Sequence, residues 1–144
     1  MRAFLFVVAS LMALSFHTAA SANDSRVVKA VNKIRLAHGL TQLQLHPSLQ
    51  TAAKVQSKIM ARKGRMSHNA AWGYSFKSRL KRGGYRVLAA ENIARGQTSL
   101  NHVLDSWMKS RGHRRNMLNP RMKFFGLAVV KGKGRNYWAM VLGG

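Results

Sequence analysis

The chain has 144 residues and a formal net charge of +22, with 25 lysines and arginines, three acidic residues and no cysteine. The absence of cysteine excludes disulfides, cysteine-ligated zinc, iron–sulfur clusters and a thiol nucleophile. A hydrophobic content of 47% argues against a disordered chain, and the length fits one domain. A mechanism that needs two carboxylates would have to use Glu91 and Asp105, or Asp24 near the N-terminal end.

The N-terminal segment, residues 1–22, has the pattern of a secretory signal peptide. Arg2 provides a short positive region, residues 3–16 are mostly apolar, and residues 20–22 match the small-x-small cleavage pattern. The alternative is a membrane anchor, but the apolar run is shorter than the about 20 residues that span a bilayer. We therefore predict a mature domain over residues 23–144 that has no transmembrane segment and is secreted or periplasmic.

Three stretches predict helices in the first half of this domain. A polar cap at residues 24–25 begins the first helix, which is expected to end at Gly39. Pro47 opens the second helix, in which apolar residues recur at helical spacing as far as Gly64. A short third helix is expected over residues 75–82.

The second half predicts a strongly amphipathic helix followed by a β-hairpin. Residues 98–99 cap this helix, and Gly112 is expected to end it. Residues 124–130 and 136–142 are apolar and partly β-branched or aromatic, as in paired strands, with residues 131–135 as the connecting loop. Helices followed by a hairpin indicate an α+β fold and not a doubly wound parallel sheet.

Four residues could carry chemistry: His68, Glu91, Ser110 and His113. Two histidines and one carboxylate form a known zinc ligand set, so these residues are candidates for one shared site. No HExxH motif or other ligand spacing supports a metal further. A single histidine is more often a hydrogen-bonded structural residue, so a shared site and a purely structural role both stay open on the residues alone.

A series of short motifs follows one another along the chain. They are VNKIR at 31–35 with GL at 39–40, Leu49 with AA at 52–53, SH at 67–68, AENIA at 90–94, WMKSRGHRRNML at 107–118, GLA at 126–128 and YW at 137–138. In their order and spacing these motifs resemble the CAP superfamily, which includes cysteine-rich secretory proteins, antigen-five venom proteins and plant pathogenesis-related proteins. The resemblance extends over residues 27–143 and is strongest to the short bacterial branch.

This resemblance implies an α-β-α sandwich with a central antiparallel sheet, including further short strands around residues 86–94. In the family, two histidines and two glutamates face a cleft, and the histidine pair can bind zinc or another divalent ion. By position the histidines are His68 and His113, and the first glutamate is Glu91. Ser110 stands where the second glutamate is expected, so the acid/base partner of His113 is absent.

The basic residues of segment 109–115 have two opposite consequences for His113. Nearby positive charge is expected to keep its imidazole neutral, which suits a metal ligand. The same charge repels a divalent cation and favours an anion. The structural alternative is that Glu91 and His113 only hold the loops of the cleft together through hydrogen bonds.

The excess of positive charge predicts polyanionic partners: anionic lipids, lipopolysaccharide, cell-wall polymers and, without sequence preference, nucleic acid. No base-reading motif is present. We therefore expect a secreted binding module, and the alternative is a metal-assisted hydrolase or protease-like enzyme that uses the His/Glu cleft. The basic runs are residues 62–65, 77–86, 109–115 and 131–135.

Overall fold

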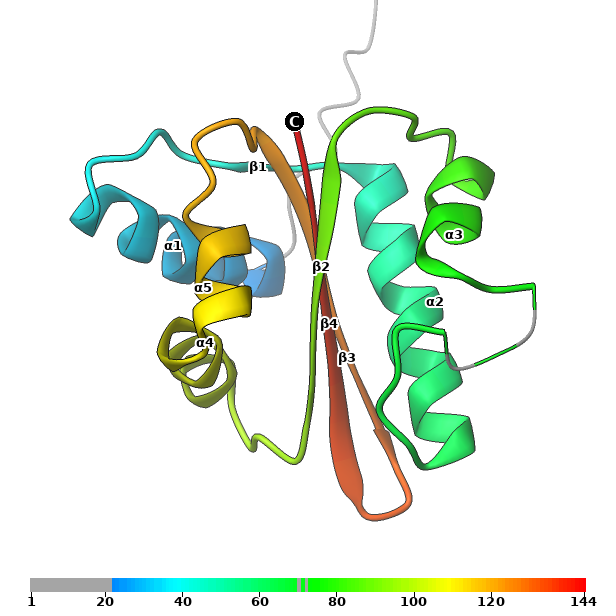
Figure 1. The fold of residues 1–144 in the computed structure, drawn as a ribbon. Coiled ribbons are helices and arrows are strands. Elements are labelled where there is room, and N and C mark those ends of the chain that lie inside the picture. The colour runs from blue at the N-terminus through cyan, green and yellow to red at the C-terminus, as the bar shows by residue number, and fades with distance from the viewer. Residues whose placement is uncertain (1–21, 70, 72) are drawn as a thin grey trace, which may run out of the picture.

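The protein is an α-β-α sandwich in the computed structural model, which describes residues 22–69, 71 and 73–144 (Figure 1). Helices α1, α4 and α5 cover one face of a four-stranded sheet, and α2 and α3 cover the other. This confirms the predicted fold class. The elements are α1 (Ala22–Ala37), β1 (Gln44–Leu45), α2 (Pro47–Lys63), α3 (Phe76–Arg82), β2 (Ala89–Arg95), α4 (Leu100–Lys109), α5 (Arg111–Met117), β3 (Phe124–Gly132) and β4 (Arg135–Gly143).

The sheet has the strand order β1-β3-β4-β2. Its three long strands are antiparallel, and Val141 in the central strand β4 lies opposite both Glu91 in β2 and Gly126 in β3. The strand expected around residues 86–94 is therefore present as β2. The sequence did not predict β1, a strand of 2 residues that pairs in parallel with β3 and makes the sheet mixed.

Local capping explains where several helices begin and end. The side chains of Ser75 and Ser99 accept hydrogen bonds from backbone N–H groups in the first turns of α3 and α4. Helix α2 begins with Pro47 and ends at Gly64, whose φ of 68° gives the left-handed C-cap conformation. The predicted boundaries of α2 and α3 and the predicted start of α4 are confirmed. The predicted cap of the first helix at residues 24–25 was wrong, because α1 is already helical at Ala22 and Asp24 lies in its first turn.

The prediction that Gly112 ends the amphipathic helix was wrong. Helix α4 already ends at Lys109, and Gly112 lies inside the next helix, α5, which starts at Arg111. Between them Ser110 has extended backbone angles, with φ −95° and ψ 120°. This single extended residue redirects the chain, so the stretch expected as one helix end becomes a junction of two helices.

The hairpin connection is also tighter than the expected five-residue loop over 131–135. Strand β3 continues to Gly132 and β4 starts at Arg135, so only Lys133 and Gly134 form the turn. Both have positive φ angles, 50° and 73°, as a two-residue turn with the twist of a β-hairpin requires.

Apolar side chains fill both sides of the sheet. One cluster, which includes the buried Trp107 and Phe125, lies against α1, α4 and α5, and a second, which includes Leu49, lies against α2. Helix α2 approaches β3 closely because Gly126 has no side chain: a Cβ there would lie 2.2 Å from the backbone nitrogen of Gln50. The two layers of helices are thus held to one central sheet by burial of apolar surface.

The predicted signal peptide, residues 1–22, lies outside the described residues apart from Ala22, with which α1 begins. Among the helices that the structure describes, none is long and apolar enough to cross a membrane. Cleavage of the signal peptide stays a prediction.

Candidate functional site

His68 and Glu91 meet at a buried arginine, Arg79, which the sequence analysis did not single out. The Nδ1 atom of His68 lies 2.8 Å from Oε1 of Glu91, and the guanidinium of Arg79 binds the other carboxylate oxygen, Oε2. The side chains of Glu91 and Arg79 are each 1% exposed, whereas that of His68 is 52% exposed. Glu91 is therefore a buried anion with one buried and one half-exposed partner.

Arg79, on α3, also orders the loop that carries His68. Its Nη1 donates to the carbonyl oxygens of His68 at 3.1 Å and Tyr74 at 2.6 Å. From α2, the amide of Gln56 donates to the carbonyl oxygen of Ser67 at 2.6 Å. These bonds fix the backbone around His68, so helices α2 and α3 together direct its ring toward the carboxylate.

Strand β2 anchors both histidine-bearing segments, because successive side chains of a strand point to opposite faces of the sheet. The side chain of Glu91 lies on the face of the sheet that α2 and α3 cover, where it contacts His68 and Arg79. On the other face, the amide of Asn92 donates to the carbonyl oxygen of His113 at 3.1 Å and accepts a hydrogen bond from Asn116 at 2.9 Å. The adjacent residues of the AENIA motif thus hold the two histidine segments on either side of one strand.

His113 lies half-buried on α5, with its ring centroid 6.4 Å from that of Trp107. Burial lowers its pKa below the ordinary value of 6.5, and the charge of His68 lowers it further. The neutral form of His113 follows mainly from burial, and not from the arginines of α5 to which the sequence analysis attributed it.

Ser110 and Asp105 do not add a catalytic group to this site. Ser110 is the junction of α4 and α5, its side chain makes no capping hydrogen bond, and none joins it to His113 in the described part of the chain. The carboxylate of Asp105 is exposed and pairs with Lys109 at 2.7 Å. Among the residues that the structure describes, the site therefore has a single carboxylate and no hydroxyl paired with a histidine.

The donors around the two histidines do not form a complete zinc site. Both carboxylate oxygens of Glu91 already bind His68 and Arg79. Among the described residues, no group of three or more His, Cys, Asp and Glu side chains could hold a metal ion. Protein zinc sites have about three or four protein ligands. The candidate ligands that remain are the Nε2 atom of His68 and the imidazole of His113. Metal binding therefore stays a prediction.

A general argument could have pointed to a partner for Glu91, but not to Arg79 itself. A glutamate in an apolar strand must be paired when it is buried, because an isolated buried charge is strongly unfavourable. The chain offers 25 lysines and arginines as partners. Only the tertiary structure, in which α3 packs on α2 and brings the guanidinium of Arg79 to Glu91, selects this residue. Arg79 lies in a basic run that the sequence alone would place in solvent.

Comparison with known proteins agrees with this architecture. The model of the CAP family, the cysteine-rich secretory protein family, matches residues 28–142. Two proteins of Bacillus subtilis (strain 168) are similar in sequence. YkwD is 35% identical over 112 residues, which cover 77% of this chain and 44% of YkwD. The membrane protein YlbC is 29% identical over 108 residues, which cover 74% of this chain and 31% of YlbC.

The chain therefore spans less than half the length of these curated relatives. Among solved structures, an extracellular SCP-domain protein of Bacillus anthracis has a TM-score of 0.73 at 29% identity, over 84% of this chain and 40% of that one. An outer surface protein of Borrelia burgdorferi has a TM-score of 0.74 at 19% identity, over 86% of this chain and 94% of that one. The chain thus belongs to the CAP family of cysteine-rich secretory proteins, although it contains no cysteine itself.

Proposed function

We propose that this CAP domain is an extracellular binding module for polyanions of the cell envelope, namely anionic lipids, lipopolysaccharide and cell-wall polymers. The observation that carries the proposal is the distribution of charge in the fold. Of the 25 lysines and arginines, Arg2 lies outside the described residues and two, Arg35 and Arg79, are buried, which leaves 22 that are all exposed. These side chains give the surface a strongly positive potential.

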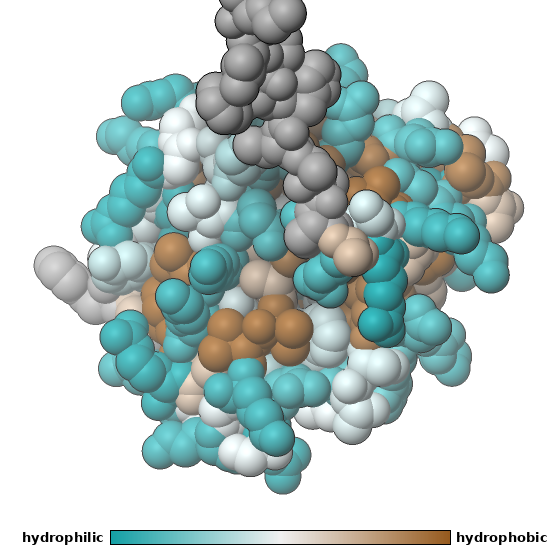
Figure 2. All heavy atoms as spheres, turned by 180° about the vertical axis from the view of Figure 1, so that it is seen from behind, coloured by the Kyte–Doolittle hydropathy of each residue, from teal (hydrophilic) through white to brown (hydrophobic). Residues whose placement is uncertain are grey.

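The acidic residues offset little of this charge. Glu91 is buried under Arg79, and Asp105 pairs with Lys109. The remaining acid, Asp24, lies in the first turn of α1. Figure 2 shows hydrophilic side chains over much of one face of the molecule, with smaller apolar patches between them. An anionic surface would therefore meet positive charge from most directions of approach.

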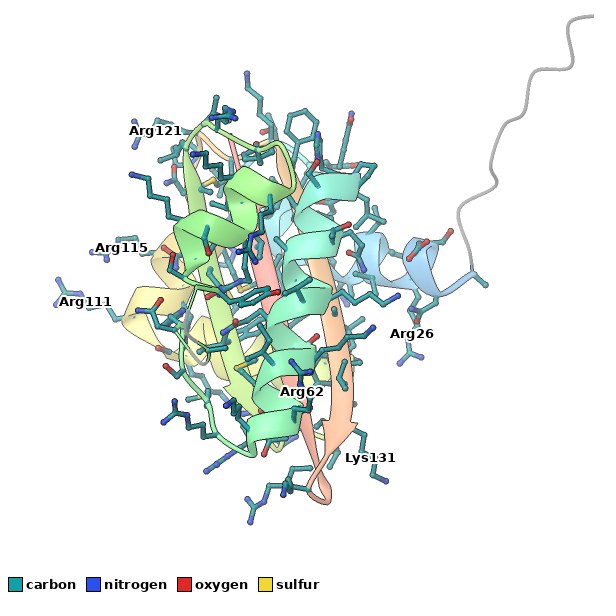
Figure 3. All side chains as sticks on the ribbon, turned by 90° about the vertical axis from the view of Figure 1, so that its right-hand side faces the viewer. Arg26, Arg62, Arg111, Arg115, Arg121 and Lys131 are labelled. Carbon is teal, nitrogen blue, oxygen red and sulfur yellow. The ribbon has the colours of Figure 1, made fainter. Side chains whose placement is uncertain are left out.

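Two basic runs that are far apart in sequence meet at one end of the sandwich. The end of α2, residues 62–65, lies against the hairpin: a Cβ on Gly64 would lie 3.2 Å from the side chain of Lys133. Arg95, at the end of β2, donates to the carbonyl oxygen of Gly64 at 3.4 Å. Arg62 and Lys131 lie toward this end in Figure 3. We name this cluster the basic pole: Arg62, Lys63, Arg65, Arg95, Lys131, Lys133 and Arg135.

The extracellular location is part of the proposal. Its support is the signal-peptide pattern of residues 1–22, together with the extracellular Bacillus anthracis protein and the outer surface protein of Borrelia burgdorferi that share the fold. A hydrolase is less well supported by the site. The carboxylate that would act as a base is bound by Arg79, and a general base must be free to take a proton from its substrate.

Polyanion binding is expected to depend steeply on salt and to be centred on the basic pole. Replacing Lys63, Arg65, Lys133 and Arg135 together with glutamine should weaken binding to duplex DNA and to phosphatidylglycerol vesicles. For DNA, the slope of log affinity against log salt concentration should become shallower by about 0.9 for each phosphate contact that is lost. Titrations at several salt concentrations measure both quantities.

The control removes the same number of charges from the other helical layer, by replacing Lys29, Lys33, Arg111 and Arg115 with glutamine. This control protein should retain more affinity and a steeper slope than the basic-pole protein. An equal loss of affinity in the two proteins would show that binding depends on the total charge and not on the basic pole. Binding that does not change with salt would contradict polyanion recognition altogether.

Our second proposal is that a divalent ion binds to His68 and His113. It is favoured by the contact between Glu91 and Nδ1 of His68, because this contact leaves the other ring nitrogen, Nε2, as a possible metal ligand. With two imidazole donors, Zn²⁺ should bind more weakly than at a site with a full set of protein ligands. Calorimetric titration with Zn²⁺ should show binding that is lost in both His68→Ala and His113→Ala and kept in His102→Ala. Unchanged Zn²⁺ binding in His68→Ala would exclude a shared site.

A further inference from the structure

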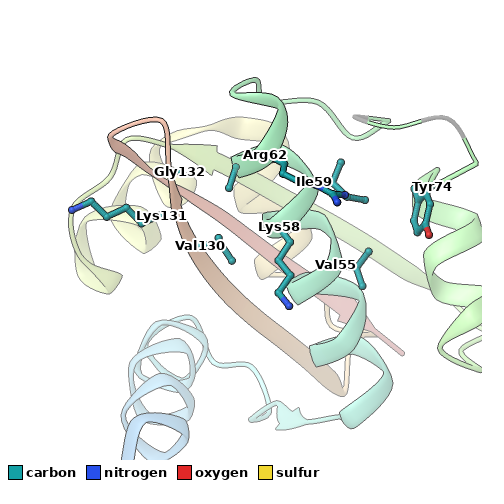
Figure 4. Close-up of a pocket in the computed structure, with 9 residues that line it drawn as sticks. Val55, Lys58, Ile59, Arg62, Tyr74, Val130, Lys131 and Gly132 are labelled. Carbon is teal, nitrogen blue, oxygen red and sulfur yellow. The ribbon is translucent and has the colours of Figure 1, made fainter.

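We infer that the outer edge of strand β3 binds an extended, acidic peptide segment of another protein as an added strand. On this edge, β1 pairs only with the first two residues of β3, Phe124 and Phe125. The rest of the edge has no strand beside it in the part of the chain that the structure describes. Figure 4 shows this stretch of β3, with Val130 and Lys131 labelled, between the helices α1 and α2. An exposed sheet edge is a known mode of peptide recognition, because its main-chain groups can pair with those of an extended segment.

The main-chain hydrogen-bonding groups of this edge are unused at two residues. In an antiparallel pair such as β3 and β4, successive residues direct their N–H and C=O groups alternately toward the partner strand and away from it. Leu127 directs both groups away from β4, since they bind the side-chain amide of Gln50, each at 2.9 Å. The same alternation turns the N–H and C=O groups of Val129 and Lys131 to this edge, where no hydrogen bond among the described residues engages them. These groups are therefore available to an added strand.

The chain itself already pairs along this edge. Strand β1 runs parallel to the start of β3, and the backbone N–H of His46 donates to the carbonyl oxygen of Phe125 at 2.9 Å. Gln50 then offers Leu127 one donor and one acceptor, as a residue of a neighbouring strand would. An added strand at residues 129–131 would continue this line of partners toward the hairpin.

A groove with a volume of about 470 Å³ lies at this edge, between the two layers of helices. Residues 127–130 of β3 form its floor. Arg26 and Val27 contribute to one wall from α1, and Lys54 contributes to the other from α2. Val129 is 44% exposed, so the free main-chain groups lie open to solvent.

Positive charge stands on both sides of the groove. Arg26 lies on the α1 side, Lys54 lies on the α2 side, and Lys131 follows on β3 itself. All three are exposed, no acidic residue lines the groove, and none of the three forms an ion pair within the described residues. Neighbouring side chains of a strand point to opposite sides, so two adjacent acidic residues of an added strand would each approach one wall. The charge therefore favours an acidic segment.

These features select this partner over two others. A second copy of the chain would bring the same cations to the edge, and like charges that face each other across paired strands are destabilising. A polyanion such as DNA could bind the cations, but it has no alternating N–H and C=O groups for Val129 and Lys131. The inference therefore goes beyond the proposed function and does not depend on it.

Titration of the ¹⁵N-labelled protein with the peptide acetyl-EEVTVEE-amide, followed by NMR, tests the inference. Saturable binding is expected, and in the complex the backbone amides of Val129 and Lys131 should exchange with solvent at least about tenfold more slowly, because a hydrogen-bonded amide exchanges only when its bond opens. The amide of Leu127 is the internal control. It is already bound by Gln50 and should change little.

Two further peptides separate the contribution of the backbone from that of charge. The same peptide with methyl groups on its three central amide nitrogens keeps every charge but loses the donors that pair with β3. It should bind at least about tenfold more weakly, as expected for the loss of one or two hydrogen bonds. The peptide acetyl-KKVTVKK-amide keeps the backbone and reverses the charge, and it should also bind at least about tenfold more weakly.

Variants of the protein make the same separation. Val129→Pro removes an edge donor that β4 does not use, and should weaken binding of acetyl-EEVTVEE-amide relative to its control Val129→Ala. Arg26→Gln with Lys54→Gln should weaken it more than Lys29→Gln with Lys58→Gln, a pair on the same two helices that does not line the groove. Duplex DNA should bind equally to Val129→Pro and Val129→Ala, so a failure of this inference is distinguishable from a failure of the proposed function.

Three results would overturn the inference. The first is equal affinity for the methylated and unmethylated acidic peptides, a comparison that needs no variant of the protein. The second is binding that leaves the exchange rates of Val129 and Lys131 unchanged, since the peptide would then lie elsewhere on the basic surface. The third is the absence of binding at millimolar peptide, which would leave Lys131 as a charge that keeps this edge from pairing with other strands.

Discussion

Replacing Arg79 with methionine is expected to lower the free energy of unfolding by about 3–5 kcal/mol, the range for removing one partner of a buried ion pair. Methionine keeps much of the apolar volume of the side chain but leaves the carboxylate of Glu91 buried without its guanidinium. It also removes the donor that binds the carbonyl oxygens of His68 and Tyr74. Urea denaturation followed by tryptophan fluorescence measures the change.

Two further variants show whether the ion pair is the cause. Lys81→Met changes an exposed cation on the same helix and should shift the unfolding free energy by no more than about 0.5 kcal/mol. Combining Arg79→Met with Glu91→Leu removes both charges and should recover most of the loss, because a buried pair can be replaced by apolar residues at little cost. An Arg79→Met protein as stable as Lys81→Met would show that the pair does not hold this cleft together.

Replacing Arg35 with methionine is expected to have a comparable effect on stability, on the opposite side of the sheet. The guanidinium of Arg35 is fully buried, and it binds the carbonyl oxygens of Thr41 at 2.8 Å, Met117 at 2.8 Å and Asn119 at 3.1 Å. Burial lowers the pKa of Arg35 below its ordinary value. Each buried acceptor left without a donor costs about 1–3 kcal/mol, so a loss of about 3 kcal/mol or more is expected in urea denaturation.

The exposed neighbour Lys33, also on α1, supplies the control, and Lys33→Met should be close to neutral. Arg35→Lys is a second control, because a lysine keeps the charge but cannot reach several carbonyl oxygens with a planar fork of donors. It should fall between the wild type and Arg35→Met. Equal stability of Arg35→Met and Lys33→Met would mean that the carbonyl oxygens find water or other donors.

The secondary structure was largely predictable because its signals are local. Ser99 and Pro47 start helices, Gly64 ends one, and apolar alternation marks the hairpin strands. The errors also have local causes. At Ser110 the backbone turns between two helices without a glycine or proline to mark it, and β1 is too short to show any alternation.

The candidate site was predictable only as a set of residues. The motifs that resemble the CAP family pointed to His68, Glu91 and His113. In the structure the ring of His68 contacts the carboxylate of Glu91, whereas the backbone of His113 is bound by Asn92, the next residue of β2. The role of Arg79 was not predictable, since a charge count treats it like every other arginine. Its burial changes the chemistry of the site, because the carboxylate is already bound.

By itself, the sequence determined the family and the order of the helices and the hairpin. It also determined that the surface is strongly positive, because the chain has 25 lysines and arginines and only three acidic residues. Only the tertiary structure decided which of these cations are buried and which ones gather. Arg35 and Arg79 enter the interior, whereas segments 62–65 and 131–135 meet at the basic pole. The reason is physical: capping and periodicity act between near neighbours in the chain, whereas burial and charge clustering depend on contacts between segments that only packing brings together.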